Sequence, residues 1–496
     1  MKRPGFLLLI ILFASACAPL TPVPGLSTAA FAAETASSSS PIPPHVIATA
    51  TRSSAPTSTP VPAHTPTLPA YLQVETSQLR GMALSVWHPL AGGQAEIFDA
   101  LVRKFNQENE WGIQVNQTAT GGNSLLYQMV ETGLKNGALP NVLVAPGELL
   151  HEWQNRSGLL IGLDDYIQHP NWGFSSLELG DFPVVFWKQD QIEDIQIGIP
   201  LTRDAQVLFY NQSWGRELGF SAPPTTAEEF KKQACAAASA ILKDQNREND
   251  GTGGWIVSTD ALALLSWLTI FGYEVPSDPN SQLTIFNVQS ARDAFDFLRA
   301  LYEEGCAWVA RNPLPYDYFA ARQALFYSGA LSDIPPQEDA IQRHESPDAW
   351  MVIPYPTAGN KPLIYTSGLS YAIFAASPQE QLASWLFIRW MATSTTQVQL
   401  IEAGGGWPVN VSAVEKLSNY RQDHPQWANT LTWIPLARPV PQGHHWLTAL
   451  RILEDAGWQL FQPQPDIKNQ IPAILAQLDL TIAEVLKILQ ETDQIR

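Results

Sequence analysis

Residues 84–115 carry the pattern that decides the fold, and they read LSVWHPLAGGQAEIFDALVRKFNQENEWGIQV. The short apolar run Leu84–Trp87 predicts a strand, and Ile113–Val115 predicts a second one. Between them, apolar residues recur at helical spacing: Ile97, Phe98, Leu101, Val102 and Phe105. The segment therefore has the order strand, helix, strand.

The same alternation continues to residue 144. Apolar positions in residues 125–134 predict a second helix, and Val142–Val144 predicts a third strand. Strands that alternate with helices indicate a parallel sheet covered by helices. Ligands of such open sheets bind beyond the carboxyl ends of the strands, here at Trp87 and His88, at Gly121–Asn123 and at Ala145–Glu148.

Length, composition and charge limit the class of protein. A chain of 496 residues, 45% of them hydrophobic, is expected to form two or three compact units. Its 29 basic and 47 acidic residues give a net charge of −18, which repels nucleic acids and anionic membranes. With three Cys, the chain can form neither a disulfide framework nor a multi-thiolate zinc site.

The first 17 residues are typical of an export signal. Lys2 and Arg3 precede the apolar run Phe6–Phe13, which is too short to span a bilayer. The run ends in Ala14-Ser15-Ala16-Cys17, which resembles the lipobox of bacterial lipoproteins. This resemblance implies that Cys17 becomes the lipid-modified N-terminus, so that the exported protein is held at the outer face of the cell membrane. The alternative is a plain secretory signal, cleaved further along.

Residues 18–75 are predicted to form a disordered tether. Within residues 18–70 there are 11 Pro, 8 Ser and 9 Thr, and only Glu34 and Arg52 are charged. Such a composition buries too little apolar surface to offset chain entropy. A flexible chain of this length would hold the globular part on the order of 40 Å from its anchor.

Three groups of motifs follow one another along the rest of the chain. They are Leu84–His88 with Ala100–Asn106; then Gly198–Leu201, Val207–Asn211, Leu218–Gly219, Pro223–Thr226 and Glu229–Phe230; then Ile353–Pro356, Ser367–Ser370, the segment from Ser377 to Phe387, and Gly406–Val409. In this order they resemble the family 1 extracellular solute-binding proteins, the sugar-binding, maltose-binding-protein-like group of ABC importers.

The resemblance implies an α/β fold of two lobes, each a sheet flanked by helices, with a ligand cleft and a hinge between them. It divides the chain into 80–201 (lobe I, first part), 202–360 (lobe II, first part), 361–430 (lobe I, second part) and 431–496 (the helical end of lobe II). The chain is expected to cross between lobes near residues 199–203, 353–365 and 418–439.

The resemblance also implies function: a monomeric receptor that captures a small polar solute, foremost a carbohydrate, and delivers it to an ABC transporter permease without a cofactor. A phosphorylated or carboxylated solute such as a glycerophosphate is the alternative ligand, because Arg203 and Asp204 stand where many relatives carry small hydroxyl residues. An extracellular glycan-processing enzyme is the alternative from another class.

Twelve residues are candidates for the ligand site. Trp87, Trp267 and Trp407 can stack on a sugar ring or belong to a core, and Arg203 can clamp an anion or pair with an acid such as Asp204. Gly121–Asn123 can donate backbone hydrogen bonds or form a tight turn. The full set is Trp87, His88, Gly122, Asn123, Glu148, Arg203, Asp204, Trp267, Tyr327, Ser367, Gly368 and Trp407.

The sequence lacks the patterns typical of catalytic and metal-binding sites. The acid pairs Asp164-Asp165 and Glu303-Glu304 are adjacent in sequence, so their side chains diverge and do not form opposed catalytic carboxylates. No metalloprotease, Walker or nucleophile-elbow motif occurs, and no metal site is expected. Cys235 and Cys306 are expected to form either one disulfide or two buried thiols.

Overall fold

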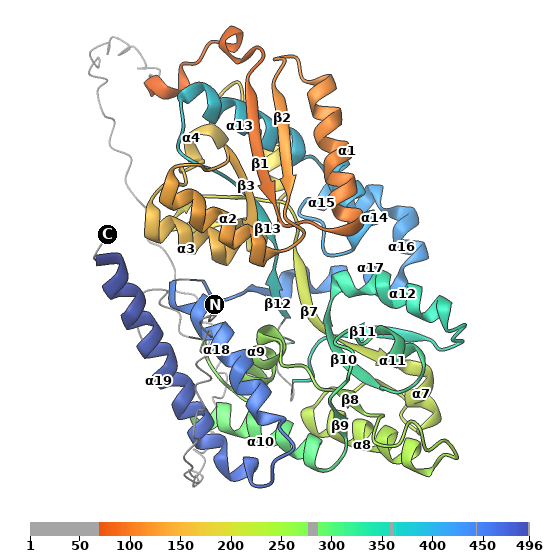
Figure 1. The fold of residues 1–496 in the computed structure, drawn as a ribbon. Coiled ribbons are helices and arrows are strands. Elements are labelled where there is room, and N and C mark those ends of the chain that lie inside the picture. The colour runs from red at the N-terminus through yellow and green to blue at the C-terminus, as the bar shows by residue number, and fades with distance from the viewer. Residues whose placement is uncertain (1–68, 276–285, 358–361, 363, 443, 495–496) are drawn as a thin grey trace, which may run out of the picture.

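The computed structural model describes residues 69–275, 286–357, 362, 364–442 and 444–494. Two α/β lobes lie one above the other in Figure 1 and are joined by strands that run between them. The signal segment, Cys17 and most of the predicted tether lie outside the described residues. In the described part of the chain, no helix is long and apolar enough to cross a membrane.

Lobe I is built on a five-stranded sheet with the order β2-β1-β3-β13-β6. Its strands are β1 (Ala83–His88), β2 (Gln114–Ala119), β3 (Val142–Pro146), β6 (Ile199–Pro200) and β13 (Leu369–Ile373). The first three are parallel, as the alternation predicts, and β13 is antiparallel to β3. The helices of this lobe include α1 (Gly92–Glu108), α2 (Asn123–Asn136), α3 (Gly147–Ser157) and α13 (Pro378–Met391).

Lobe II is built on a second sheet with the order β14-β12-β7-β10-β8-β9, and β11 also pairs with β7. Its strands are β7 (Asp204–Asn211), β8 (Trp255–Ile256), β9 (Ala307–Trp308), β10 (Phe326–Ala330), β11 (Trp350–Ile353), β12 (Ile364–Ser367) and β14 (Ala437–Pro439). Its longer helices are α8 (Ala227–Lys243), α9 (Ala261–Ile270), α10 (Gln289–Glu303), α18 (His444–Leu460) and α19 (Ile467–Gln494).

Shorter helices and strands complete the two lobes. They are η1 (Ala70–Leu72), η2 (Thr76–Leu79), α4 (Asp164–Ile167), α5 (Ser176–Gly180), α6 (Val184–Lys188), β4 (Gln191–Ile192), β5 (Ile195–Gln196), α7 (Gln212–Glu217), α11 (Tyr316–Ala320), η3 (Leu331–Asp333), α12 (Ile334–Arg343), α14 (Ser394–Gly404), α15 (Val411–Lys416), α16 (Ser418–Asp423), α17 (Pro425–Thr430) and η4 (Leu431–Leu436).

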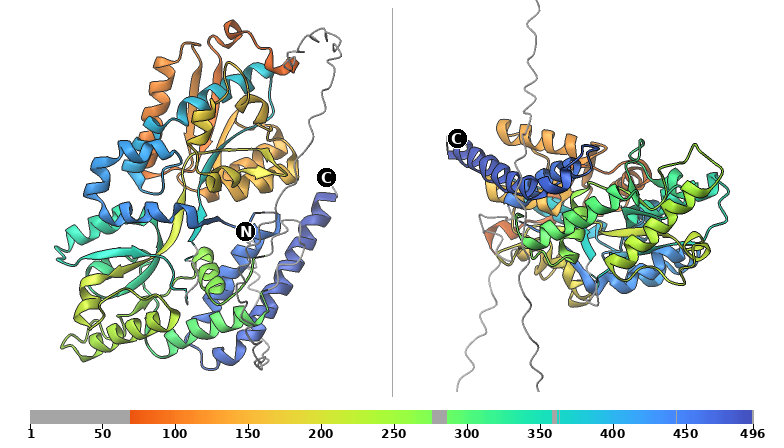
Figure 2. Two further views of the ribbon diagram at one scale, coloured as in Figure 1. Left: turned by 180° about the vertical axis from the view of Figure 1, so that it is seen from behind. Right: turned by 90° about the horizontal axis from the view of Figure 1, so that it is seen from below.

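The C-terminal helices pack together on one side of lobe II, where α19 lies against α18 and α10 (Figure 2). Apolar residues of α19 such as Ile474, Leu475 and Leu478 are buried in the core of this lobe. Helix α18 also contacts α3 of lobe I, so the two lobes touch beside the hinge as well as through it.

The chain passes from lobe I to lobe II between β6 and β7, at residues 201–203. It returns between β12, which pairs with β7 and β14, and β13, which pairs with β3. The turn between these two strands is Gly368, where a Cβ would lie 2.1 Å from the carbonyl oxygen of Thr202. The return boundary, predicted at residues 360–361, is therefore corrected to Gly368.

Two further boundaries also differ from the prediction. Leu72 and Val74 are only 2% and 6% exposed and belong to the core of lobe I, so the tether cannot extend to residue 75. Within residues 361–430, predicted to lie in lobe I, Tyr420 and Trp427 pack in one cluster with Phe209 of lobe II. Leu72 and Val74 lie in an otherwise polar segment, and Tyr420 and Trp427 lie on short helices. The local sequence does not indicate which lobe such residues pack against.

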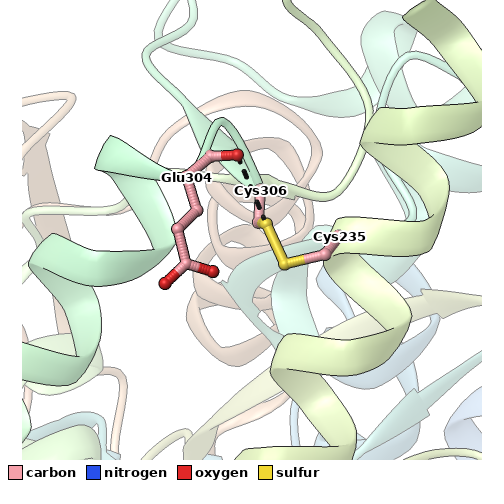
Figure 3. Close-up of side chains that lie close together, drawn as sticks. All are labelled: Cys235, Glu304 and Cys306. Carbon is pink, nitrogen blue, oxygen red and sulfur yellow. Dashed lines mark hydrogen bonds between the residues drawn. A yellow bond between two sulfur atoms is a disulfide. The ribbon is translucent and has the colours of Figure 1, made fainter.

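Cys235 of α8 and Cys306, just before β9, form a disulfide with a Cα–Cα distance of 4.3 Å (Figure 3). Of the two alternatives for these cysteines, the structure has the disulfide. It closes a loop over a sequence separation of 71 residues, which in the chain-entropy model contributes about 4 kcal/mol to the stability of lobe II. Glu304 lies next to the pair, but two sulfurs bonded to each other leave no thiolate for a metal ion.

Candidate functional site

A cavity of about 240 Å³ lies at the hinge, where both lobes and the crossing segments meet. Lobe I contributes residues of α1, α2 and α3 that follow the carboxyl ends of its parallel strands, and lobe II contributes η3. The loop Gly404–Gly406 closes one side. The polar side chains that line the cavity are Gln94, Asn123, Glu148, Thr202, Arg203, Asp204, Ser332 and Ser367.

Half of the predicted site residues line this cavity: Asn123, Glu148, Arg203, Asp204, Ser367 and Gly368. Asn123 is the first residue of α2 and is exposed. Gly122 is the N-cap of that helix and is not among the lining residues. The amide of Gly147 donates to the carbonyl of Gly368 at 3.4 Å, which joins the start of α3 to the hinge turn.

Glu148 stands in the first turn of α3, directly after β3. Its Oε2 atom is buried and has no hydrogen-bond donor among the described residues. Burial raises the pKa of this carboxyl group, and a hydrogen bond from its own backbone amide and the charge of Arg203 oppose the rise only in part. Glu148 therefore brings an unsatisfied acceptor to the cavity.

Asp204 begins β7 and ties the hinge to lobe II. Its Oδ1 atom accepts hydrogen bonds from the amides of Leu331 at 2.7 Å and Ser332 at 3.3 Å, both in η3. Burial raises the pKa of Asp204, while hydrogen bonds from the Ser332 side chain and from the amides of Ala205 and Ser332 favour its charged form. Asp204 thus holds η3, and with it the Ser332 side chain, at the edge of the cavity.

Arg203 lines the cavity, and both of its Nη groups donate hydrogen bonds within the protein. Its Nη2 donates to Asp190 Oδ2 at 2.7 Å and to the Phe186 carbonyl at 3.0 Å, both in lobe I. Its Nη1 donates to the carbonyls of Thr202 and Leu369 and to Ser370 Oγ, at 2.9 to 3.1 Å. The side chain is completely buried, as is that of Asp190.

The predicted role of Arg203 is corrected accordingly. Both Nη groups are used within the protein, so the planar fork is not free to clamp an anion. The residue does pair with an acid, as the alternative supposed, but that acid is Asp190, and Asp204 points instead to η3. Arg203 holds both crossing segments against lobe I.

The structure does not bring the predicted aromatic platforms to the cavity. Trp267 and Trp407 are fully buried, the first in the core of lobe II and the second in the cluster around β7. Tyr327 is also fully buried and stacks on Phe209 with ring centroids 4.3 Å apart. A side chain with no exposed surface offers no face to a solute, so the prediction for these three is corrected.

Trp87 and His88 end β1 but are covered by neighbouring helices. Trp87 is half-buried against the cluster formed by α2, α3 and β3. His88 is buried, its ring lies 4.5 Å from that of Phe98, and its Nε2 is 2.7 Å from Gln117 Oε1. Burial lowers the pKa of His88, which favours the neutral ring. Neither residue lines the hinge cavity. The prediction for His88 is corrected, because its side chain is buried, whereas Trp87 keeps part of its surface exposed and its role as a stacking platform stays a prediction.

The lining residues outside the predicted set are Gln94, Pro146, Thr202, Ser332, Leu369 and the run Gly404–Gly406. The three consecutive glycines are a visible signal, because such a run lets the backbone approach a ligand closely. Nothing local marks Gln94 or Ser332, which reach the cavity only because the start of α1 and the short helix η3 lie beside it.

Solved structures share this architecture. The sugar-binding protein MalE from Xanthomonas citri matches with a TM-score of 0.68 and 18% identity over 84% of this chain and 100% of its own. The UgpB protein of Mycobacterium tuberculosis, solved with glycerophosphocholine, matches at 0.66 and 17% identity over 82% of this chain and 99% of its own. The cyclic alpha-maltosyl-1,6-maltose binding protein of Arthrobacter globiformis gives 0.65 and 16%, over 81% and 99%. At these identities the likeness establishes the two-lobed α/β fold.

Sequence comparison supplies the family. No curated protein matches the chain in a direct search. The family model for bacterial extracellular solute-binding proteins matches residues 100–430, which include both lobes, the hinge and most of the cavity. The chain therefore belongs to the bacterial extracellular solute-binding proteins.

Proposed function

We propose that this protein binds a carbohydrate in the cavity at its hinge and delivers it to the permease of an ABC transporter. The observation that carries the proposal is the lining of the cavity: hydroxyl, amide and carboxyl groups from both lobes converge on it. Such groups match the hydroxyls of a polyhydroxylated solute, which needs many short hydrogen bonds. Sugar-binding proteins among the structural neighbours support the same class of ligand.

Capture would proceed by closure of the lobes. Asn123 and Gln94 reach the cavity from lobe I, whereas Ser332 reaches it from lobe II. A solute that contacts both sides at once binds the closed arrangement better than the open one, and this difference drives the equilibrium toward closure. The hinge would bend at residues 201–203 and at Gly368, where the chain passes between the sheets.

An anionic solute is less well supported. The UgpB structure contains glycerophosphocholine, which carries a phosphate group, so a phosphorylated solute is the second ligand class to test. In this chain, however, the guanidinium of Arg203 is already paired with Asp190, and Glu148 and Asp204 add two acidic groups to the lining. The same two acids are the reason to assay glycan hydrolysis: release of reducing ends by the purified protein would favour an enzyme over a receptor.

Asn123→Ala tests the position of the site. Asn123 is exposed on the cavity and its replacement removes an amide without touching a core, so affinity should fall roughly 2- to 10-fold, the effect of one hydrogen bond. A thermal-shift screen with mono- and oligosaccharides would find the solute, and calorimetry would measure both proteins. Gln128→Ala, exposed on the same helix but away from the cavity, is the control. Equal effects of the two substitutions would place the site elsewhere.

We also propose that Cys17 carries the lipid anchor of a monomeric receptor on the cell surface. The apolar run Phe6–Phe13 is too short to retain the protein in a bilayer by itself. Cys17→Ser should therefore shift the protein from the membrane to the soluble fraction, measured by fractionation and immunoblot. Membrane retention of this variant would contradict the proposal.

A further inference from the structure

The cavity has an unbalanced charge. Its ionisable lining residues are Glu148, Arg203 and Asp204. The positive charge of Arg203 is matched by Asp190, whose Oδ2 is 2.7 Å from its Nη2. Two carboxyl groups therefore remain without a cationic side chain among the described lining residues.

The two acids differ in how they are compensated. Asp204 accepts hydrogen bonds from the backbone amides of Ala205, Leu331 and Ser332, which offset its charge. Glu148 Oε2 accepts none from the described residues and is buried. Burial of Glu148 disfavours its charged form, and a hydrogen bond from its own backbone amide and the charge of Arg203 offset this cost only in part, since the charge of Asp190 acts the other way.

A second carboxyl oxygen near Glu148, Oδ1 of Asp190, also lacks a hydrogen-bond donor among the described residues. This oxygen is buried, and a Cβ on Gly147 would lie 3.3 Å from it. Of the donors of Arg203, only Nε–H is unused. The side-chain amide of Gln442 is also unpaired among the described residues, with its Nε2 3.8 Å from the same Cβ position. Neutral donors therefore lie near these oxygens, but Arg203 is the only cationic side chain among the described residues that line the cavity.

We propose that the cavity selects a carbohydrate that carries a protonated amine, and that Glu148 pairs with the ammonium group. This rests on the proposed carbohydrate-binding function and narrows its ligand class. An ammonium group brings three N–H donors, no acceptor and one positive charge, and this charge is what the described lining lacks. A neutral hydroxyl brings one donor and no charge. A phosphate or carboxylate would meet the two carboxyl groups and be repelled.

The pairing would also relieve the burial of Glu148. A positive charge within a few ångströms favours the carboxylate form, and so counteracts the rise in the pKa that burial causes. An acetylated amine keeps one N–H but loses the charge, so it should behave as a neutral sugar.

Matched ligands test the proposal with the full chain near neutral pH. The probes are glucosamine, N-acetylglucosamine and glucose, each also as its α-1,4- and β-1,4-linked disaccharide, with affinity measured by calorimetry. We expect at least one amine-bearing probe to bind roughly tenfold or more tightly than both its acetylated and its neutral counterparts.

Variants assign the preference to Glu148. Glu148→Gln should reduce the ratio of amine to neutral affinity by about tenfold, and Glu148→Asp, which keeps the charge, should retain a preference. Glu96→Gln removes the same charge from an exposed position of α1 outside the cavity and should leave the ratio unchanged. Melting curves of each variant check that the fold is intact.

The same measurements distinguish failure of the amine preference from failure of carbohydrate binding. Neutral sugars that bind as tightly as amine-bearing ones would overturn the inference and leave the carbohydrate receptor standing. A proportional loss for both ligand types in Glu148→Gln would also overturn it, because it would assign Glu148 to the hinge network of Arg203. Failure of every saccharide to bind would overturn the proposed function itself.

Discussion

Arg203→Ala is expected to lower the free energy of unfolding by about 3 to 5 kcal/mol, the usual cost of breaking a buried ion pair by removing one partner. Asp190 would be left charged and completely buried, without the guanidinium that now lies 2.7 Å away. The carbonyls of Phe186 and Leu369 would also lose their donors, which loosens both crossing segments from lobe I.

Chemical denaturation, followed by tryptophan fluorescence, measures this loss. Removing both charges in Arg203→Ala/Asp190→Ala should cost less than the two single losses added together, since no unpaired charge then remains. Arg421→Ala is the control, because Arg421 is exposed on α16 and such changes stay within about 0.5 kcal/mol. Unchanged stability together with a large loss of solute affinity would restore Arg203 to the role of ligand clamp.

Trp267→Ala is expected to lower the free energy of unfolding by about 3 to 5 kcal/mol through the lost apolar burial and the cavity left behind. The indole is fully buried and lies edge-on to Phe230 at 5.0 Å and to Tyr355 at 5.3 Å between ring centroids. Trp267 does not line the hinge cavity, so the protein that remains folded at low temperature should bind its solute with nearly normal affinity.

Both quantities must be measured on the same variant. Denaturation reports the stability of lobe II, and calorimetry at low temperature reports affinity. Trp267→Phe keeps most of the ring volume and should recover a large part of the stability. If Trp267→Ala instead melted normally and lost binding, the indole would have to reach the solute in a conformation other than this one.

The strands and helices of lobe I could be predicted because their signals are local. The side chains of α1 that face the core, such as Phe98 and Leu101, recur with the helical period of the chain itself. The parallel order of β1, β2 and β3 follows from the helices that separate them. A ligand site beyond the carboxyl ends of these strands could therefore be predicted, and Asn123 and Glu148 from this region line the cavity.

The burial of the aromatic residues of the predicted site could not be predicted from the local sequence. Trp87, Trp267 and Trp407 all have the chemistry of a sugar platform, but burial depends on what packs against them. That covering comes from segments distant in sequence: the indole of Trp407, for example, donates to Thr430 and its ring stacks on Phe186. Nothing near Trp407 in the sequence shows that these residues would surround it.

The sequence by itself determined the alternation of strands and helices, the acidic charge and the membership of a two-lobed family, since each depends on composition, spacing or the order of motifs. Only the tertiary structure decided which side chains meet at the hinge. Ser370 lies 167 residues from Arg203 along the chain, and with Asp190 they form one network because two crossing segments pass the same part of lobe I. That network occupies both Nη groups of the guanidinium and leaves Glu148 Oε2 without a donor among the described residues, because ion pairing depends on distances that folding alone establishes.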